Sequence, residues 1–152
     1  MKKMLWIEDN FEVGAELTPI LEENGIDVYS APSLRSADYK IERIPGLNNI
    51  DVLITDLNMD DYPKFEETYT EYRDKLLDEI ELNLTGLVWL KRFIEQHPEF
   101  SQKRIAVFSG YIENRIVEEL RSFAPEVEII DKLAPDLKEK LIGFIQNSGI
   151  KD

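Results

Sequence analysis

The stretch IDVLITDLNM, residues 50–59, decides the fold of this chain. It begins as an apolar, β-branched run of strand length and ends in a carboxylate and polar residues. A run that is apolar on both faces fits an inner strand of a parallel sheet better than a half-exposed strand. Ligands of open α/β sheets bind where the strands end, at their carboxyl edge. The stretch therefore predicts a central strand with Asp56 at the lip of a crevice, although such an aspartate also fits a turn or a helix cap.

The composition indicates one soluble globular domain. The chain has 152 residues, of which 43% are hydrophobic and 32% charged, a length and a balance typical of a domain with its own core. No apolar run is long enough for a membrane span or for the apolar core of a signal peptide. There is no cysteine, so disulfides, thiolate nucleophiles and cysteine-based metal sites are excluded. We therefore expect a cytoplasmic protein.

The charge and the histidine count narrow the function further. A net charge of −13 argues against nucleic acid as a partner, because phosphate backbones are bound by a surplus of Lys and Arg. It suits cationic partners or metal ions instead. The single histidine, His97, directly precedes Pro98, which favours a place at a helix end where it complements the helix dipole. A Ser-His-Asp or zinc-histidine site would need this one residue, so those enzyme classes are nearly excluded.

Five apolar runs alternate with segments of helical periodicity. The runs are Met4–Ile7, Ile26–Tyr29, the stretch from Ile50, Arg104–Phe108 and Val127–Ile130. Strands that alternate with helices predict a parallel sheet covered on both faces. The second and fifth runs each carry an internal acid, Asp27 and Glu128, which indicates edge strands. We therefore predict an α/β, flavodoxin-like doubly wound sheet of five parallel strands in the order 2-1-3-4-5.

An acidic stretch interrupts this pattern after the third strand. Residues 60–82 hold nine acidic and three basic residues, a net charge of −6. Five apolar or aromatic residues recur in it at helical spacing: Phe65, Tyr69, Tyr72, Leu76 and Ile80. The spacing predicts an extra or extended helix inserted after strand 3, whose stripe either packs against its own domain or docks a partner. Thr85 and Gly86 are expected to open the following helix, which runs to Gln96.

The predicted strand order brings polar residues together at the carboxyl edge of the sheet. Glu8 and Asp9 follow the first strand and lie beside Asp56, while Ser109 follows the fourth strand and Lys132 the fifth. Three neighbouring carboxylates repel one another unless a cation neutralises them. Neither cysteine nor histidine is at hand, so the site is built from oxygen, which suits a hard ion such as Mg²⁺.

A hydroxyl and an ammonium group beside these carboxylates fit a phosphoryl group. Mg²⁺ and Lys132 would stabilise the charge on its oxygens, Ser109 would donate a hydrogen bond, and a carboxylate could act as nucleophile. This constellation resembles the receiver domain of two-component response regulators, over nearly the whole chain apart from the acidic stretch. On that resemblance, residues 1–150 form a single receiver domain with an acidic helical insertion at 60–83, and residues 151–152 are a tail.

The resemblance implies a role for each matched residue. Asp56 is the phospho-acceptor, and Ser109 and Lys132 supply the hydroxyl and the ammonium group that meet the phosphoryl group. Gly110 leaves room for that group. The metal ion would be Mg²⁺, bound by four residues of which the last contributes its backbone carbonyl: Glu8, Asp9, Asp56 and Asn58.

The resemblance also implies the partners. A histidine kinase or phosphotransfer protein would hand its phosphoryl group to Asp56. The chain, a monomer or weak dimer, would then signal by binding a downstream protein whose identity the sequence does not give. Its only chemistry would be phosphorylation and dephosphorylation of its own aspartate, so we do not expect an enzyme that acts on a separate substrate. Neither nucleic acid nor a membrane is expected as a partner.

Three positions differ from the family pattern and keep two alternatives open. Asp60-Asp61 stand near a position that is usually proline, Ile129 replaces a common aromatic residue, and Leu133 replaces a frequent proline. One alternative is a degenerate receiver that is never phosphorylated and acts as a protein-binding adaptor. The other is a Mg²⁺-dependent phosphoryl hydrolase, which would need a second acid where Asn58 stands.

Overall fold

The structure of the chain is a computed structural model. It describes residues 2–44, 49–57, 59, 70–71, 81–102, 104–110, 112 and 114–146. Most of the predicted insertion, residues 60–69 and 72–80, lies outside the described residues, as does the predicted tail. Within the described ranges, no helix is both long and apolar enough to cross a membrane.

Strands and helices alternate along the described part of the chain. The strands are β1 (Lys2–Ile7), β2 (Ile26–Ala31), β3 (Val52–Thr55), β4 (Arg104–Ser109) and β5 (Glu128–Asp131). The α-helices are α1 (Phe11–Glu23), α2 (Leu34–Ile41), α4 (Glu81–Gln96), α5 (Asn114–Phe123) and α6 (Leu137–Gln146). A short 3-10 helix, η3 (Pro98–Gln102), follows α4.

Side-chain caps explain where the first two helices begin. The side chain of Asn10 accepts hydrogen bonds from the backbone N–H groups of Glu12 and Val13, at 3.0 and 3.3 Å. The hydroxyl of Ser33 accepts one from the N–H of Ser36 at 2.9 Å. These bonds satisfy donors that have no partner inside the first turn of a helix. The start of α1 is therefore fixed directly after the acidic residues that follow β1.

The five strands form one parallel sheet in the order β2-β1-β3-β4-β5, which confirms the predicted order and both predicted edge strands. The register pairs Ile7 with Thr55 and Ser109 with Asp131. The carboxyl ends of β2, β1 and β3 are therefore level, whereas β4 and β5 extend two residues further, because Thr55 pairs with Val107. Residues that directly follow these strands meet at one edge of the sheet.

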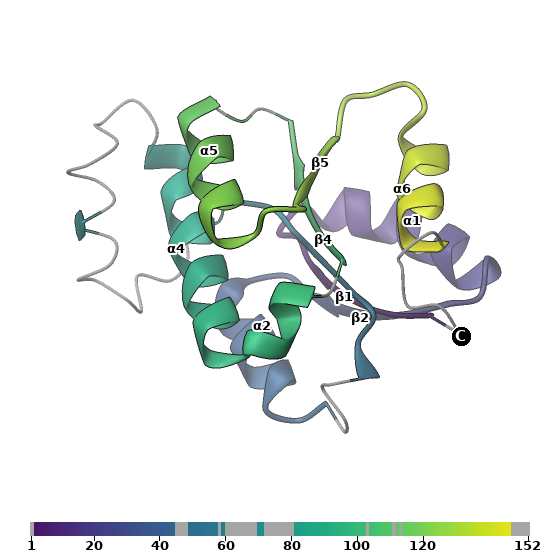
Figure 1. The fold of residues 1–152 in the computed structure, drawn as a ribbon. Helices are drawn as coiled ribbons and strands as arrows, with labels where there is room; N and C mark the ends of the chain where they lie inside the picture. The colour runs from purple at the N-terminus through teal and green to yellow at the C-terminus, as the bar shows by residue number, and fades with distance from the viewer. Residues whose placement is uncertain are drawn as a thin grey trace.

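The sheet is covered by helices on both faces (Figure 1). Buried residues of α2, α4 and α5 pack on one face, where Leu53 of β3 joins them. Those of α1 and α6 pack on the other face, where Val52 and Ile54 of β3 join them. All four residues of β3 are buried, because the strand contributes to both cores. This explains why its sequence is apolar without alternation.

Two helix boundaries differ from the prediction. Helix α4 begins at Glu81 and passes through Gly86, so the prediction that Thr85 and Gly86 open it was wrong. A Cβ atom on Gly86 would lie 2.4 Å from the Cα atom of Leu57, and the N–H of Gly86 donates to the carbonyl of Leu57 at 3.2 Å. The glycine is needed for this close approach inside the helix. The spacing of Leu34, Ala37, Ile41 and Ile44 predicts a helix from Ser33 to Ile44, whereas helix α2 ends at Ile41.

Candidate functional site

Two acidic residues are held at the carboxyl edge by the continuation of the strand ladder. The N–H of Glu8 donates to the carbonyl of Ala31 at 3.0 Å, and the N–H of Asp56 donates to the carbonyl of Ile7 at 2.9 Å. Both residues are buried, with 7% of Glu8 and 3% of Asp56 exposed. The backbone therefore places two carboxylates of different strands side by side and away from solvent.

Lys132 joins these two carboxylates. Its ammonium nitrogen lies 2.7 Å from Oε1 of Glu8 and 2.7 Å from Oδ2 of Asp56. Its backbone N–H donates to the carbonyl of Ser109 at 3.2 Å, which ties the residue to the end of β4. Glu8 and Asp56, which lie 124 and 76 positions before Lys132 in the sequence, thus contact the same amine.

Burial and ion pairing shift the pKa values of Glu8 and Lys132 in opposite directions. Burial raises the pKa of Glu8 above its ordinary value, although the hydrogen bond and the charge of Lys132 lower it. Burial also lowers the pKa of Lys132, but the hydrogen bonds and charges of Asp56 and Glu8 outweigh it, so this pKa stands above its ordinary value. Lys132 is therefore a stable cation here, and Glu8 depends on positive charge to stay ionised.

Three carboxylates form a group that fits a metal ion. Glu8, Asp9 and Asp56 each offer an oxygen, and these oxygens lie within 4.8 Å of one another. Oε2 of Glu8 is buried, and no group of the described residues forms a hydrogen bond with it. The donors are all oxygen, and the three negative charges exceed the single positive charge of Lys132 by two. A divalent, oxygen-binding cation such as Mg²⁺ matches both properties.

Of the remaining predicted site residues, the structure describes Ser109 and Gly110. Ser109 ends β4, is 6% exposed and is in register with Asp131 of β5, so it lies beside the backbone of Lys132. Gly110 follows it and is exposed. Asn58, the predicted fourth metal ligand, lies outside the described residues. The structure thus brings Glu8, Asp9, Asp56 and Lys132 together and sets Ser109 at their side.

Two contacts of the cluster were missed by the sequence analysis. The ring centroid of Phe108 lies 5.4 Å from the ammonium nitrogen of Lys132, and Trp6 packs edge-on against this ring at 6.0 Å. The backbone N–H of Asn10 donates to Oε1 of Glu8 at 3.1 Å. Phe108 was counted only as a core residue of β4, because no local pattern shows that its ring would lie near a lysine of another strand.

Comparison with known proteins identifies the fold. No protein-family model matches the chain, and no curated protein matches it. The chemotaxis protein CheY4 of Vibrio cholerae is 18% identical with a TM-score of 0.69, covering 97% of this chain and 98% of that one. A receiver domain of the Francisella response regulator 1452 is 20% identical with a TM-score of 0.62, covering 97% and 95%.

A third solved structure, a CheY-like receiver domain protein of Methanospirillum hungatei, is 17% identical with a TM-score of 0.66, again covering 97% and 95%. The TM-scores show a shared fold over nearly the whole length of the chain. The fold expected from strand order and from the polar strand ends is confirmed. The chain has the flavodoxin-like fold of response regulator receiver domains.

Proposed function

We propose that this protein is a phospho-accepting receiver that takes a phosphoryl group onto Asp56 in a Mg²⁺-dependent reaction and signals by binding another protein. The phosphodonor would be a histidine kinase or phosphotransfer protein of the cytoplasm. The chain would act on its own aspartate only and not on a separate substrate.

The observation that carries the proposal is the pairing of Lys132 with Glu8 and Asp56, at 2.7 Å each, beside the carboxylate of Asp9. Phosphoryl transfer places negative charge on oxygens that must be stabilised by cations already in position. The partly buried amine of Lys132 supplies one cation at the carboxylate of Asp56, and the cluster of carboxylate oxygens could hold a divalent ion as the second. The likeness in fold to solved response regulator receiver domains supports a receiver role.

Each residue of the site has its own role in phosphoryl transfer. A carboxylate oxygen of Asp56 attacks the phosphorus atom; the new P–O bond replaces the P–N bond to the donor histidine, whose ring nitrogen keeps the electron pair. Lys132 holds a positive charge next to this carboxylate, and Ser109, at the end of the neighbouring strand β4, would donate a hydrogen bond to the phosphoryl group. Glu8, Asp9 and Asp56 would hold Mg²⁺, which when bound supplies charge neutralisation at the phosphoryl oxygens.

The test is phosphorylation by a small donor. We expect acetyl phosphate and Mg²⁺ to add one phosphoryl group to the intact protein, measured as a mass increase that is stable in acid and lost in base. Asp56→Asn should abolish the adduct, whereas Asp51→Asn, at an aspartate that precedes β3, should leave it unchanged. Asp51 is a matched control because its carboxylate accepts a hydrogen bond from the backbone N–H of Lys3, away from the cluster.

Two outcomes would contradict the proposal. The absence of any adduct, together with undetectable Mg²⁺ binding by calorimetry, would favour the adaptor that is never phosphorylated. An adduct that survives in Asp56→Asn would show that another side chain is the acceptor.

A further inference from the structure

The side chain of Lys132 crosses a neighbouring strand to reach the carboxylates. In the sheet order β2-β1-β3-β4-β5, strand β4 lies between β5 and β3. Lys132 directly follows β5, whereas Asp56 directly follows β3 and Glu8 directly follows β1. The amine nonetheless lies 2.7 Å from an oxygen of each acid. The lysine side chain therefore passes over the end of β4.

Phe108 is the residue of β4 that lies on this path. The register pairs Thr55 of β3 with Val107 of β4. The next residues along the two segments, Asp56 and Phe108, are therefore level with each other. The ammonium nitrogen of Lys132 lies over the ring of Phe108, 5.4 Å from its centroid, and the phenylalanine is fully buried. The amine thus contacts an aromatic ring as well as two carboxylates.

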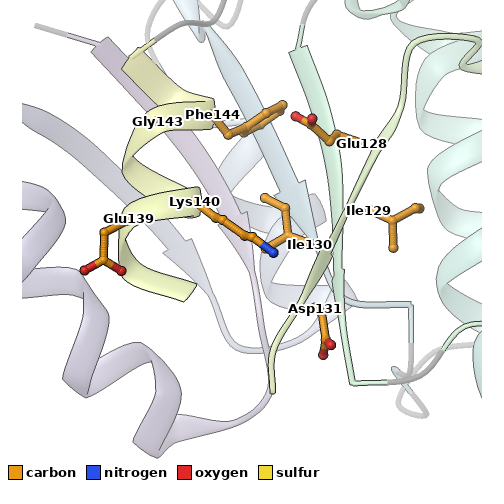
Figure 2. A pocket seen from close by; sticks show the side chains of 8 residues that line it. All are labelled: Glu128, Ile129, Ile130, Asp131, Glu139, Lys140, Gly143 and Phe144. Atoms are coloured by element: carbon orange, nitrogen blue, oxygen red, sulfur yellow. The ribbon is translucent and has the colours of Figure 1, made fainter. Parts of the chain in front are cut away.

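The ring and the lysine belong to the same face of the sheet. Phe108 pairs with Ile130 of β5, and both are part of the core on the α1 and α6 face. Ile130 lines the groove between β5 and α6, and its side chain points toward α6 (Figure 2). Lys132 comes two residues after Ile130, and side chains two residues apart on a strand share a face. The lysine therefore meets the sheet on the face where the Phe108 ring is packed.

A second aromatic side chain restrains this ring. Trp6 of β1 packs edge-on against Phe108, with 6.0 Å between the ring centroids and 76° between the ring planes. Trp6 is 1% exposed, and no described residue accepts a hydrogen bond from its Nε1. A buried donor without a partner costs stability, and a leucine or phenylalanine at this position would avoid that cost. The contribution of the indole is therefore its packing, which fixes the plane of the Phe108 ring.

The ion pairs of Lys132 change during phosphoryl transfer. One oxygen of Asp56 forms the new P–O bond, so its charge is shared with the phosphoryl group. The amine must stay in place at this moment, because it neutralises charge on the phosphoryl oxygens. Its contact with the Phe108 ring involves no carboxylate oxygen, so the transfer does not remove it. A cation is attracted to the face of an aromatic ring most strongly where water is excluded.

We propose that Phe108, with its ring held by Trp6, is a positioning residue for phosphoryl transfer: it keeps the ammonium group of Lys132 beside Asp56 while the ion pairs rearrange. This inference rests on the proposed function of Asp56. The alternative is that Phe108 only fills the core. A core residue acts through its volume, whereas a positioning ring acts through the negative charge of its face, so the two can be separated.

The first test changes the charge of the ring face and nearly preserves its size. Phe108 is replaced in the full chain by phenylalanine carrying one, two or three fluorine atoms on the ring, and formation of the Asp56 adduct from acetyl phosphate and Mg²⁺ is followed by intact mass. Each fluorine withdraws charge from the ring face, so the rate constant should fall stepwise, by about fivefold in total. Equal rates across the series would overturn the proposal.

The second test removes the ring. Phe108→Leu should slow adduct formation by at least the same factor, and Trp6→Leu by a smaller one, because Trp6 acts through the Phe108 ring. Phe100→Leu is the matched control and should react like the parent protein, since Phe100 is also fully buried but lies in the core of the other face. Equal slowing in Phe108→Leu and Phe100→Leu would assign the effect to general loosening of the core and overturn the proposal.

A third measurement does not depend on phosphorylation. NMR relaxation of the ¹⁵N-labelled ammonium group of Lys132 reports how firmly the amine is held. It should show more motion in Phe108→Leu than in the parent protein or in Phe100→Leu, and equal order in all three would overturn the proposal. A parent protein that takes no phosphoryl group but shows this difference would refute the proposed function, and with it the role in transfer, while the contact between ring and amine stands. The two failures are therefore told apart.

Discussion

The two faces of the sheet are packed to different degrees. On the face covered by α4, a Cβ atom on Gly86 would lie 2.4 Å from the Cα atom of Leu57, directly after Asp56. On the face covered by α6, Gly143 has open space at its Cβ position, and a groove of about 440 Å³ lies beside β5. The difference shows that α4 packs tightly against the residue that follows Asp56, whereas α6 packs more loosely against the edge of the sheet.

The largest expected effect comes from filling the tight contact. Gly86→Ala places a Cβ atom against the backbone of Leu57, which cannot move aside as a flexible side chain would. We expect the free energy of unfolding to fall by at least about 3 kcal/mol, the upper part of the range for overpacked cores. Urea denaturation followed by circular dichroism measures it. A loss below about 1 kcal/mol would mean that α4 shifts easily and is not packed tightly against Leu57.

The second-largest expected effect tests the cluster of Glu8, Asp56 and Lys132 at the carboxyl edge of the sheet. Lys132→Met removes the only cation seen at Glu8 and Asp56 among the described residues, and it leaves two buried carboxylates facing each other. We expect about 2–3 kcal/mol of destabilisation without Mg²⁺, somewhat below the cost of breaking a fully buried pair, because the lysine is partly exposed. Saturating Mg²⁺ should restore much of this loss.

Mg²⁺ binding itself should survive in Lys132→Met, because an ammonium group cannot ligate the ion and the three carboxylates that would hold it remain. Calorimetric titration of both proteins checks this. A variant that no longer binds Mg²⁺ would show that Lys132 organises the metal site and that its role here is wrongly assigned.

A third effect concerns the α6 face beneath the lysine. The ring of Phe108 lies 5.4 Å from the ammonium nitrogen of Lys132, within the range of a cation–π interaction. A double-mutant cycle of Phe108→Leu and Lys132→Met should give a coupling energy of about 1 kcal/mol. The control cycle uses Phe100→Leu, since Phe100 is fully buried in the core of the other face. Equal coupling in both cycles would assign the effect to general repacking.

Much of the fold and most of the site followed from the sequence because parallel strands bring their carboxyl ends together. The apolar run before Asp56 predicted an inner strand, and the internal acids Asp27 and Glu128 predicted the two edges. That order placed Glu8 and Lys132 on either side of Asp56, where the structure has them.

The contacts that decide packing could not be predicted in the same way. Gly86 lies inside α4 and close to the backbone of Leu57, and the ring beside Lys132 belongs to Phe108 on another strand. Both are contacts between segments, so no periodicity in one segment reveals them. The groove beside Gly143 likewise exists only once α6 is laid against β5.

The smallest expected effect is a gain in stability, and it tests how loosely the α6 face is packed. Gly143→Ala adds a Cβ atom in open space and strengthens a helix. We expect the free energy of unfolding to rise by about 0.5–1 kcal/mol, the usual difference between glycine and alanine in a helix. Gly14→Ala in α1 should do the same. If instead Gly143→Ala destabilises the protein as Gly86→Ala does, the α6 face is packed as tightly as the α4 face, and the groove closes in solution.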